Sequence, residues 1–103
     1  MSEVLKAAFI FVAPQASAQQ HYSWVKTPQV EVKMLAVSDY QQACDQIDAL
    51  IEEGMVAIEL CAGFGHQGVA AISEKADGRV PVGVVRFDHH PGLSYNTGDN
   101  LFR

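Results

Sequence analysis

The stretch from residue 55 to residue 68, MVAIELCAGFGHQG, decides the fold. Its first seven residues are almost all apolar, as expected of a buried β-strand. Gly63, Gly65 and Gly68 follow, and glycines at this spacing permit the sharp turn that leads from a strand into a helix. Small and apolar residues then recur at helical spacing over 67–76. The stretch therefore predicts a strand–turn–helix unit of an α/β domain.

Apolar runs on either side of this unit predict three further strands, at residues 5–13, 30–37 and 80–87. A second helix is predicted to begin after Ser38, which forms a capping box with Gln41, and to end at Gly54. Residues 15–26 carry polar and aromatic side chains and fit either a short helix or an ordered loop.

Strands that alternate with helices usually pair in parallel. The 5–13 strand is apolar throughout and should be covered on both faces, whereas the 30–37 strand alternates and should lie at an edge. The predicted fold is α/β, with a four-stranded, mostly parallel sheet in the order 2-1-3-4, a truncated flavodoxin-like or Rossmann-like arrangement. One domain spans residues 1–103, and residues 88–103 form an irregular C-terminal tail.

The fourth strand, 80–87, would lie at the other edge of this sheet, yet it is as apolar as an interior strand. An exposed apolar edge invites pairing with another chain. Either the 88–103 tail covers this edge or a second subunit does, and the pattern favours a homo-oligomer.

Composition excludes several classes of protein. The 103 residues, 49% of them hydrophobic, suffice for one thin core that buries about 60% of the unfolded surface. Seven basic residues against twelve acidic ones, for a net charge of −5, argue against nucleic-acid binding. No apolar run is long enough to span a membrane, and residues 1–14 lack the basic start of a signal peptide. Two cysteines without a CxxC motif suggest a reduced, cytoplasmic protein.

The carboxyl ends of parallel strands form the edge at which such sheets bind ligands. There the turn after the third strand matches G-x-G-x-x-G, a pattern whose backbone N–H groups can cradle an anion. The alternative is a tight turn that merely needs glycine. The expected ligand is a small anionic molecule, no cofactor is assigned, and the candidate ligand-binding residues are Gly63, Phe64, Gly65, His66, Gly68, Arg86 and His89.

Titratable side chains at the same strand ends give the candidate catalytic residues Glu59, Cys61, His66, Asp88 and His90. Glu59 either forms a buried pair with Arg86 or acts as a general acid or base with a raised pKa. Cys61 is either a small strand-end hydrophobe or a thiolate nucleophile. Adjacent histidines on extended chain point in opposite directions, so at most one of His89 and His90 should face the site. The alternative is that one of them bonds the turn while the other lies in solvent.

A metal site is a further alternative. His66, one of the two late histidines, and Asp88 or Glu59 would supply two imidazoles and a carboxylate. No pair of histidines stands at the i, i+4 spacing that pre-arranges such a site, so no metal ligand is assigned.

Three segments carry a resemblance: AAFIFVAP at 7–14, AIELCAGFGHQGVAAI at 57–72 and VPVGVVRFDHHPG at 80–92. Together they resemble a family of small bacterial proteins of about this length, known as a domain of unknown function. The resemblance implies a compact α/β domain with its patterned residues around the glycine turn and the 86–92 segment, and it implies no catalytic role.

The residues thus favour an α/β protein that binds a small anionic metabolite at the strand carboxyl ends. If the site is catalytic, acid–base chemistry of the isomerase or lyase kind suits its histidines and carboxylates better than hydride transfer. The alternative is a non-catalytic oligomeric module, in which the same residues fix turns and buried pairs. A metal-dependent enzyme is the third possibility.

Overall fold

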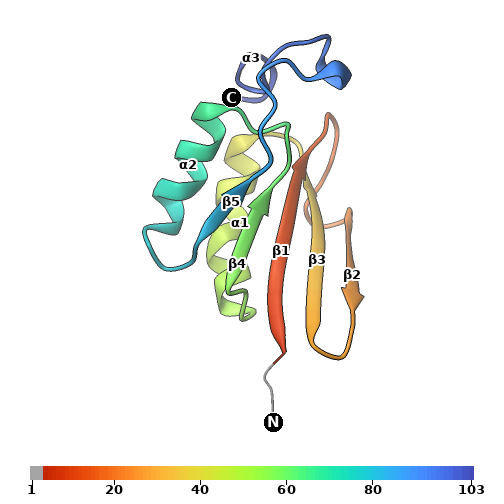
Figure 1. Ribbon diagram of the computed structural model, residues 1–103, viewed down its shortest axis with the longest axis vertical. Coiled ribbons are helices and arrows are strands. Elements are labelled where there is room, and N and C mark those ends of the chain that lie inside the picture. Colours follow the sequence, from red (N-terminus) through yellow and green to blue (C-terminus); the bar gives the residue numbers. More distant parts are fainter. Residues whose placement is uncertain (1–3) are drawn as a thin grey trace.

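The computed structural model describes residues 4–103 and contains five strands and three α-helices within them (Figure 1). The strands are β1 Leu5–Val12, β2 Tyr22–Lys26, β3 Val30–Val37, β4 Ala57–Leu60 and β5 Val82–Val84. The helices are α1 Tyr40–Glu52, α2 His66–Ala76 and α3 Asp99–Phe102, with a 3₁₀ turn, η1, at Pro91–Leu93. Residues 1–3, where the domain and the signal-peptide predictions begin, lie outside the described residues.

The predicted α/β class with a mostly parallel sheet is confirmed, but the predicted four-strand order is incomplete. The sheet has five strands in the order β2-β3-β1-β4-β5. β1 pairs in parallel with both β3 and β4, β4 pairs in parallel with β5, and β2 runs antiparallel to β3.

The prediction of a helix or a loop at residues 15–26 is wrong for its second half, which forms β2. Aromatic and β-branched residues such as Tyr22, Trp24 and Val25 suit a half-covered pleated surface. The turn into β3 is closed by Thr27, whose hydroxyl accepts the N–H of Val30 at 3.0 Å. β3 is therefore an interior strand and not the predicted edge.

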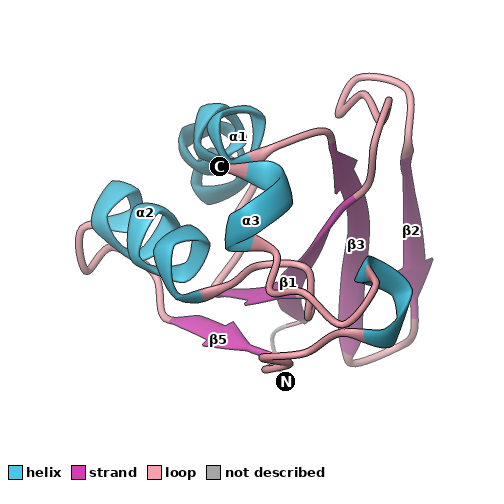
Figure 2. Cartoon of the chain, turned by 90° about the horizontal axis from the view of Figure 1, so that it is seen from above, coloured by secondary structure: helices cyan, strands magenta, loops and turns pink. Residues whose placement is uncertain are grey.

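Both long helices lie on the same face of the sheet (Figures 1 and 2). Right-handed crossovers from β3 to β4 and from β4 to β5 move in one direction across the sheet, so α1 and α2 cover one face. The connection from β1 to β3 would place a helix on the other face, but it runs through β2 instead. The flavodoxin-like expectation of a sheet covered on both faces is wrong for this reason.

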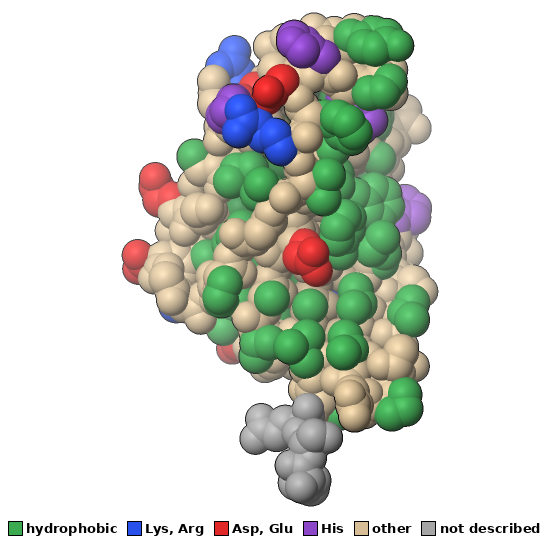
Figure 3. All heavy atoms as spheres, in the orientation of Figure 1, with side chains coloured by type: hydrophobic (Ala, Val, Ile, Leu, Met, Phe, Trp, Pro, Cys, Tyr) green, Lys and Arg blue, Asp and Glu red, His purple; other side chains and the backbone are tan. Residues whose placement is uncertain are grey.

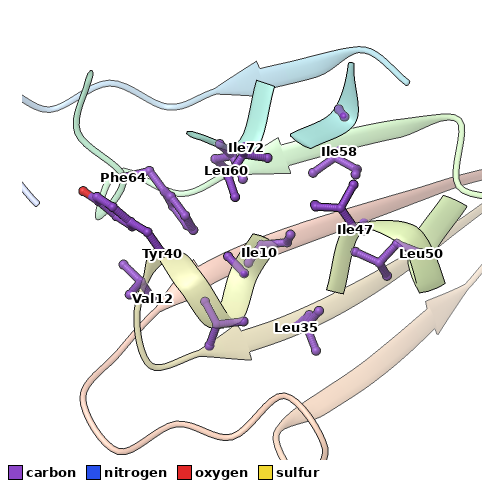
Figure 4. Close-up of a cluster of buried hydrophobic side chains, with 14 of the residues drawn as sticks. Ile10, Val12, Leu35, Tyr40, Ile47, Leu50, Ile58, Leu60, Phe64 and Ile72 are labelled. Carbon is purple, nitrogen blue, oxygen red and sulfur yellow. The ribbon is translucent and has the colours of Figure 1, made fainter. Parts of the chain in front are cut away.

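The hydrophobic core lies between that covered face and the two helices (Figure 4). Alternate strand residues such as Ile10, Leu35 and Leu60 point toward Ile47 of α1 and Ile72 of α2, and all five are fully buried. β1 shows the difference between the two faces of the sheet. Its residues on the uncovered face, Leu5, Phe9 and Phe11, are exposed or half-buried, and only the small Ala7 on that face is buried.

The ends of α1 and α2 differ in detail from the predictions. Asp39, not Ser38, caps α1 by accepting the N–H of Gln42 at 2.8 Å. Gly54 follows α1 with a φ of +96°, the left-handed conformation expected where a helix ends. α2 begins at His66, one residue earlier than predicted, and ends at Ala76 as predicted.

The fourth predicted strand is shorter than expected. Only Val82–Val84 pair with β4, and they do form an edge of the sheet. The 88–103 tail neither covers that edge as a strand nor stays irregular throughout, because it forms η1 and α3. Asp99 and Phe102 of α3 are buried against the rest of the chain.

Candidate functional site

Two segments far apart in the sequence meet at the carboxyl ends of β4 and β5. The glycine turn, residues 63–68, leads from β4 into α2, and residues 85–88 leave β5 beside it. Nη2 of Arg86 lies 2.7 Å from Nε2 of His66. The convergence on which the candidate site depends is therefore present in the structure.

The glycine turn is packed too closely to hold side chains. A Cβ atom at Gly65 would collide with the side chains of Thr97 and Asp99, and one at Gly68 would collide with the ring of Tyr40. Phe64, predicted to contact a ligand, is 2% exposed and stacks on the Tyr40 ring at 5.4 Å between centroids (Figure 4). Close packing by α1 and the tail thus explains why residues 65 and 68 are glycines. This agrees with the alternative interpretation of the motif, a tight turn that merely needs glycine.

The chain's own carboxylate fills the start of α2. Asp99 accepts the backbone N–H groups of Gln67 at 3.0 Å and of Gly68 at 3.3 Å. It also accepts the Tyr40 hydroxyl at 2.9 Å, and that hydroxyl accepts the N–H of Gly65 at 3.0 Å. A carboxylate at a helix N-terminus satisfies N–H groups that otherwise lack partners. Donors expected to hold a ligand anion are therefore already bonded within the chain.

These contacts shift the pKa of both side chains. Burial acts to raise the pKa of Asp99, but the hydrogen bonds from Gln67, Tyr40 and Gly68 outweigh it and hold that pKa below its usual value. Burial raises the pKa of Tyr40 far above its usual value, and the neighbouring Asp99 carboxylate raises it further. Asp99 is therefore ionised and Tyr40 is neutral over the physiological pH range.

A second group of polar side chains, here called the rim cluster, lies beside this turn and consists of His66, Arg86 and Asp88. Nε of Arg86 donates to Oδ1 of Asp88 at 2.8 Å, and that oxygen lies 3.8 Å from Nε2 of His66. The hydrogen bond from Arg86 lowers the pKa of Asp88. All three side chains are more than half exposed to solvent.

The rim cluster borders a small hollow of about 100 Å³. Apolar side chains form most of its wall, and the lining residues are Phe64, Gly65, His66, Val69, Val84, Val85 and Arg86. An apolar hollow with a few polar groups on its border is the usual form of a small-molecule site.

Glu59 and Cys61 lie apart from the rim cluster. Glu59 is exposed on the uncovered face of the sheet, in register with Phe9 and Gly83, and it forms no ion pair within residues 4–103. The predicted Glu59–Arg86 pair is wrong, because Arg86 bonds Asp88 and His66 instead. The half-buried Cys61 thiol accepts the N–H of Gly63 at 3.2 Å.

The two late histidines bond their own turn. Nδ1 of His90 accepts the N–H of Gly92 at 2.9 Å, and the ring packs edge-on against Phe87. Nδ1 of His89 lies 3.3 Å from the carbonyl oxygen of Tyr95. Among residues 4–103, no three His, Cys, Asp or Glu side chains stand close enough together to hold a metal ion.

Sequence reasoning missed Tyr40 and Asp99. Tyr40 fits the apolar stripe of α1 and gave no sign of a polar contact, and Asp99 lies in a tail expected to be irregular. They stand 59 residues apart and meet only when the tail folds back over the glycine turn. The one available signal was the number of glycines in the turn, which implies that something approaches its backbone closely.

No helix within residues 4–103 is both long enough and apolar enough to cross a membrane. No curated protein and no solved structure matches this chain. A family model does match, over residues 5–100, which include the whole sheet, the glycine turn and the rim cluster. The chain therefore belongs to the family described as "Family of unknown function (DUF6506)".

Proposed function

We propose that this domain binds a small organic anion, a carboxylate or a phosphate ester, at the rim cluster. The observation that carries the proposal is the 2.7 Å contact between Arg86 and His66, both exposed at the border of an apolar hollow. In parallel sheets this edge is where ligands usually bind. The two free cysteines, Cys44 and Cys61, support a cytoplasmic location.

Arg86 is the main anion ligand in this proposal. Its guanidinium is planar and presents several N–H donors, so it can hold a carboxylate or a phosphate through two hydrogen bonds. Asp88 bonds Nε of Arg86 and orients the side chain, which leaves Nη1 and the N–H of Nη2 that does not face His66 for the ligand. The apolar wall formed by Val69, Val84 and Phe64 would contact the carbon part of the ligand.

His66 is the group suited to acid–base chemistry. Nε2 of His66 faces an arginine N–H, which donates only, so Nε2 accepts and the proton of the neutral ring lies on Nδ1. A bound anion that drew Arg86 away would free Nε2 to take or give a proton next to the ligand. Glu59, Cys61 and His90 have no part in this proposal, since they lie on other surfaces or bond their own turns.

The second candidate function is a non-catalytic binding module. It is favoured by the bonding of the glycine turn, whose N–H groups at Gly65, Gln67 and Gly68 already have partners within the chain. This candidate predicts that His66→Ala leaves ligand binding intact and that the protein converts none of its ligands.

Thermal unfolding with inorganic phosphate, a dicarboxylate and a sugar phosphate tests the proposal. A ligand at 100 times its Kd stabilises the folded state by about 2.7 kcal/mol, which is readily measured. We expect at least one anion to raise the Tm of the wild type and to have no effect on Arg86→Ala.

Arg79→Ala is the matched control, because Arg79 is another exposed arginine paired with an aspartate, Asp48, outside the rim cluster. It should respond to the anion as the wild type does. Equal stabilisation of Arg86→Ala and the wild type would overturn the proposal, and so would the absence of any stabilising anion.

A further inference from the structure

The face of the sheet that α1 and α2 leave uncovered is apolar and nearly free of charge. Hydrophobic side chains spread across it in Figure 3, with few polar groups among them. The residues on this face follow from strand alternation and register, and they are Leu5, Ala7, Phe9 and Phe11 of β1, Val30, Val32, Met34 and Ala36 of β3, Ser23 and Val25 of β2, Ala57 and Glu59 of β4, and Gly83 of β5.

Such a face is unusual for a sheet whose inner strands are parallel. Parallel strands occur almost only in sheets that are covered on both faces. Here β1, β3 and β4 have helices on one face only, while Met34 is 40% exposed and Val25 is 64% exposed on the other. Contiguous apolar areas of more than a few hundred Å² usually mark an interaction surface.

The size of the face fits one half of a protein–protein interface. Eight residues of β1 or β3 rise about 26 Å, and five strands about 4.8 Å apart span about 24 Å, so the tapering sheet projects roughly 500 Å². This projected area is of the same order as the about 800 Å² that each partner contributes to a standard interface, and protruding side chains add accessible surface to it.

We propose that a second copy of this chain covers the face and that the protein is a two-fold symmetric dimer. An apolar surface without a pattern of charges is complementary to itself, and a two-fold dimer places the same patch on both subunits. Sheets pack face to face about 10 Å apart through such surfaces. The dimer thus gives each sheet the second layer that its topology leaves out.

The few polar groups on the face support this assignment. One row across the sheet reads Ser23, Met34, Phe9 and Glu59, so Glu59 lies one strand to one side of β1 and Ser23 lies two strands to the other. A two-fold axis along β1 carries β4 of one copy over β3 of the other. Glu59 then lies over Met34 of the second copy, one strand from Ser23, whose hydroxyl can donate to the carboxylate.

His21 supplies a second donor at the same place. It precedes β2 and lines a hollow with Phe11, Ser23 and Met34 on this face. Nδ1 of His21 accepts the N–H of Ser17 at 2.9 Å, so the proton of the neutral ring lies on Nε2. A carboxylate that becomes buried in an interface needs donors of this kind, and Glu59 has no ion-pair partner within residues 4–103 of its own chain.

This surface replaces the edge of the fourth strand as the place of subunit contact. β5 has only three residues, and short edge strands resist pairing with other chains. The proposed dimer uses a different surface from the rim cluster. A test that overturns the dimer therefore leaves the proposal of anion binding unaffected, and the reverse also holds.

Sedimentation equilibrium and light scattering of the untagged full chain at micromolar concentrations test the dimer. The wild type should show twice the chain mass of 11.2 kDa. Met34→Glu places a charge in the centre of the face and should lower the dimer fraction at least tenfold while circular dichroism still shows the folded protein. Leu101→Glu is the matched control, because Leu101 is 54% exposed on α3, away from the face, and its variant should stay dimeric.

Val25→Lys is the second variant, for the case that Met34→Glu does not fold. Val25 is highly exposed on the edge strand β2, so the isolated subunit tolerates the change while the interface does not. A monomeric wild type overturns the proposal, whether or not another protein binds the face. A dimer that withstands either substitution in the folded state overturns it as well, because the contact would then lie elsewhere.

Discussion

The glycine turn and the rim cluster lie side by side at the end of the same strands, yet their polar groups stand in opposite situations. At the glycine turn, the Asp99 carboxylate is buried and takes hydrogen bonds from two backbone N–H groups and one hydroxyl. In the rim cluster, Arg86 and Asp88 bond each other in solvent. The same chemistry, a carboxylate with its donors, is enclosed by the fold in the first region and exposed to solvent in the second, where we propose that a ligand binds.

Asp99→Ala should lower the free energy of unfolding more than Gly98→Ala or Arg86→Ala. A smaller loss would contradict the comparison between the two regions. The substitution removes the acceptor from the N–H groups of Gln67 and Gly68 and from the Tyr40 hydroxyl. Leaving buried donors unpaired costs about 1–3 kcal/mol, so we expect the free energy of unfolding to fall by about 2–3 kcal/mol in urea denaturation. Asn100→Ala, at the exposed neighbouring residue, should change it by less than about 0.5 kcal/mol.

Gly98→Ala should have the next largest effect. A Cβ at Gly98 would collide with the carbonyl group of Gly63, so the tail would have to move away from the glycine turn. Overpacking of this kind costs about 1–3 kcal/mol. Gly83→Ala is the control, since a Cβ there meets nothing within 4 Å. If limited proteolysis of the tail were equally fast in both variants, the tail would not be held at this point.

The pH dependence of stability should separate the two regions further. The folded-state pKa of Asp99 is lowered, so its carboxylate stabilises the fold fully above the unfolded pKa of about 3.9, and this contribution is lost as the pH falls through the lower folded-state value. The difference in unfolding free energy between the wild type and Asp99→Asn should therefore be constant at neutral pH and shrink below pH 4. A difference that grew on acidification would contradict the assignment.

Arg86→Ala should have the smallest effect on stability. The Arg86–Asp88 pair is exposed, and exposed ion pairs contribute little to folding. We expect an unchanged Tm in the absence of ligand, together with a rise in the pKa of Asp88 toward its ordinary value, measured by NMR titration of the carboxyl group. Arg79→Ala should leave the pKa of Asp88 where it is. A clear loss of Tm in Arg86→Ala would place the rim cluster with the glycine turn as a structural element.

Local patterns in the sequence were sufficient to predict the parallel strands and both long helices. Hydrophobic periodicity located β1, β3, β4, α1 and α2, because each of these elements presents apolar residues to one core. It did not locate β2, since Tyr22–Lys26 lies at the edge and is largely exposed. The sequence also did not predict that one face of the sheet lacks helices. An apolar strand has the same composition whether a helix or another subunit covers it.

The candidate site was predictable where it depends on strand ends and not where it depends on the tail. His66 and Arg86 lie just beyond the carboxyl ends of the neighbouring strands β4 and β5. The order of the strands in the sheet therefore predicts that the two side chains lie close together. The bond between Tyr40 and Asp99 joins an apolar-looking helix stripe to a short tail, and no spacing rule covers a contact of that kind. Only the complete tertiary fold determines which carboxylate reaches the start of α2.

The position of Asp99 also bears on how the protein is made. All five strands and both long helices emerge from the ribosome before residue 99, so α2 waits without the group that completes its first turn. At a synthesis rate of about 5–20 residues per second, the interval between the end of β5 at residue 84 and residue 99 lasts on the order of one to three seconds. During that interval the nascent domain has its sheet but lacks the Asp99 carboxylate at the start of α2. It is then most accessible to chaperones and proteases.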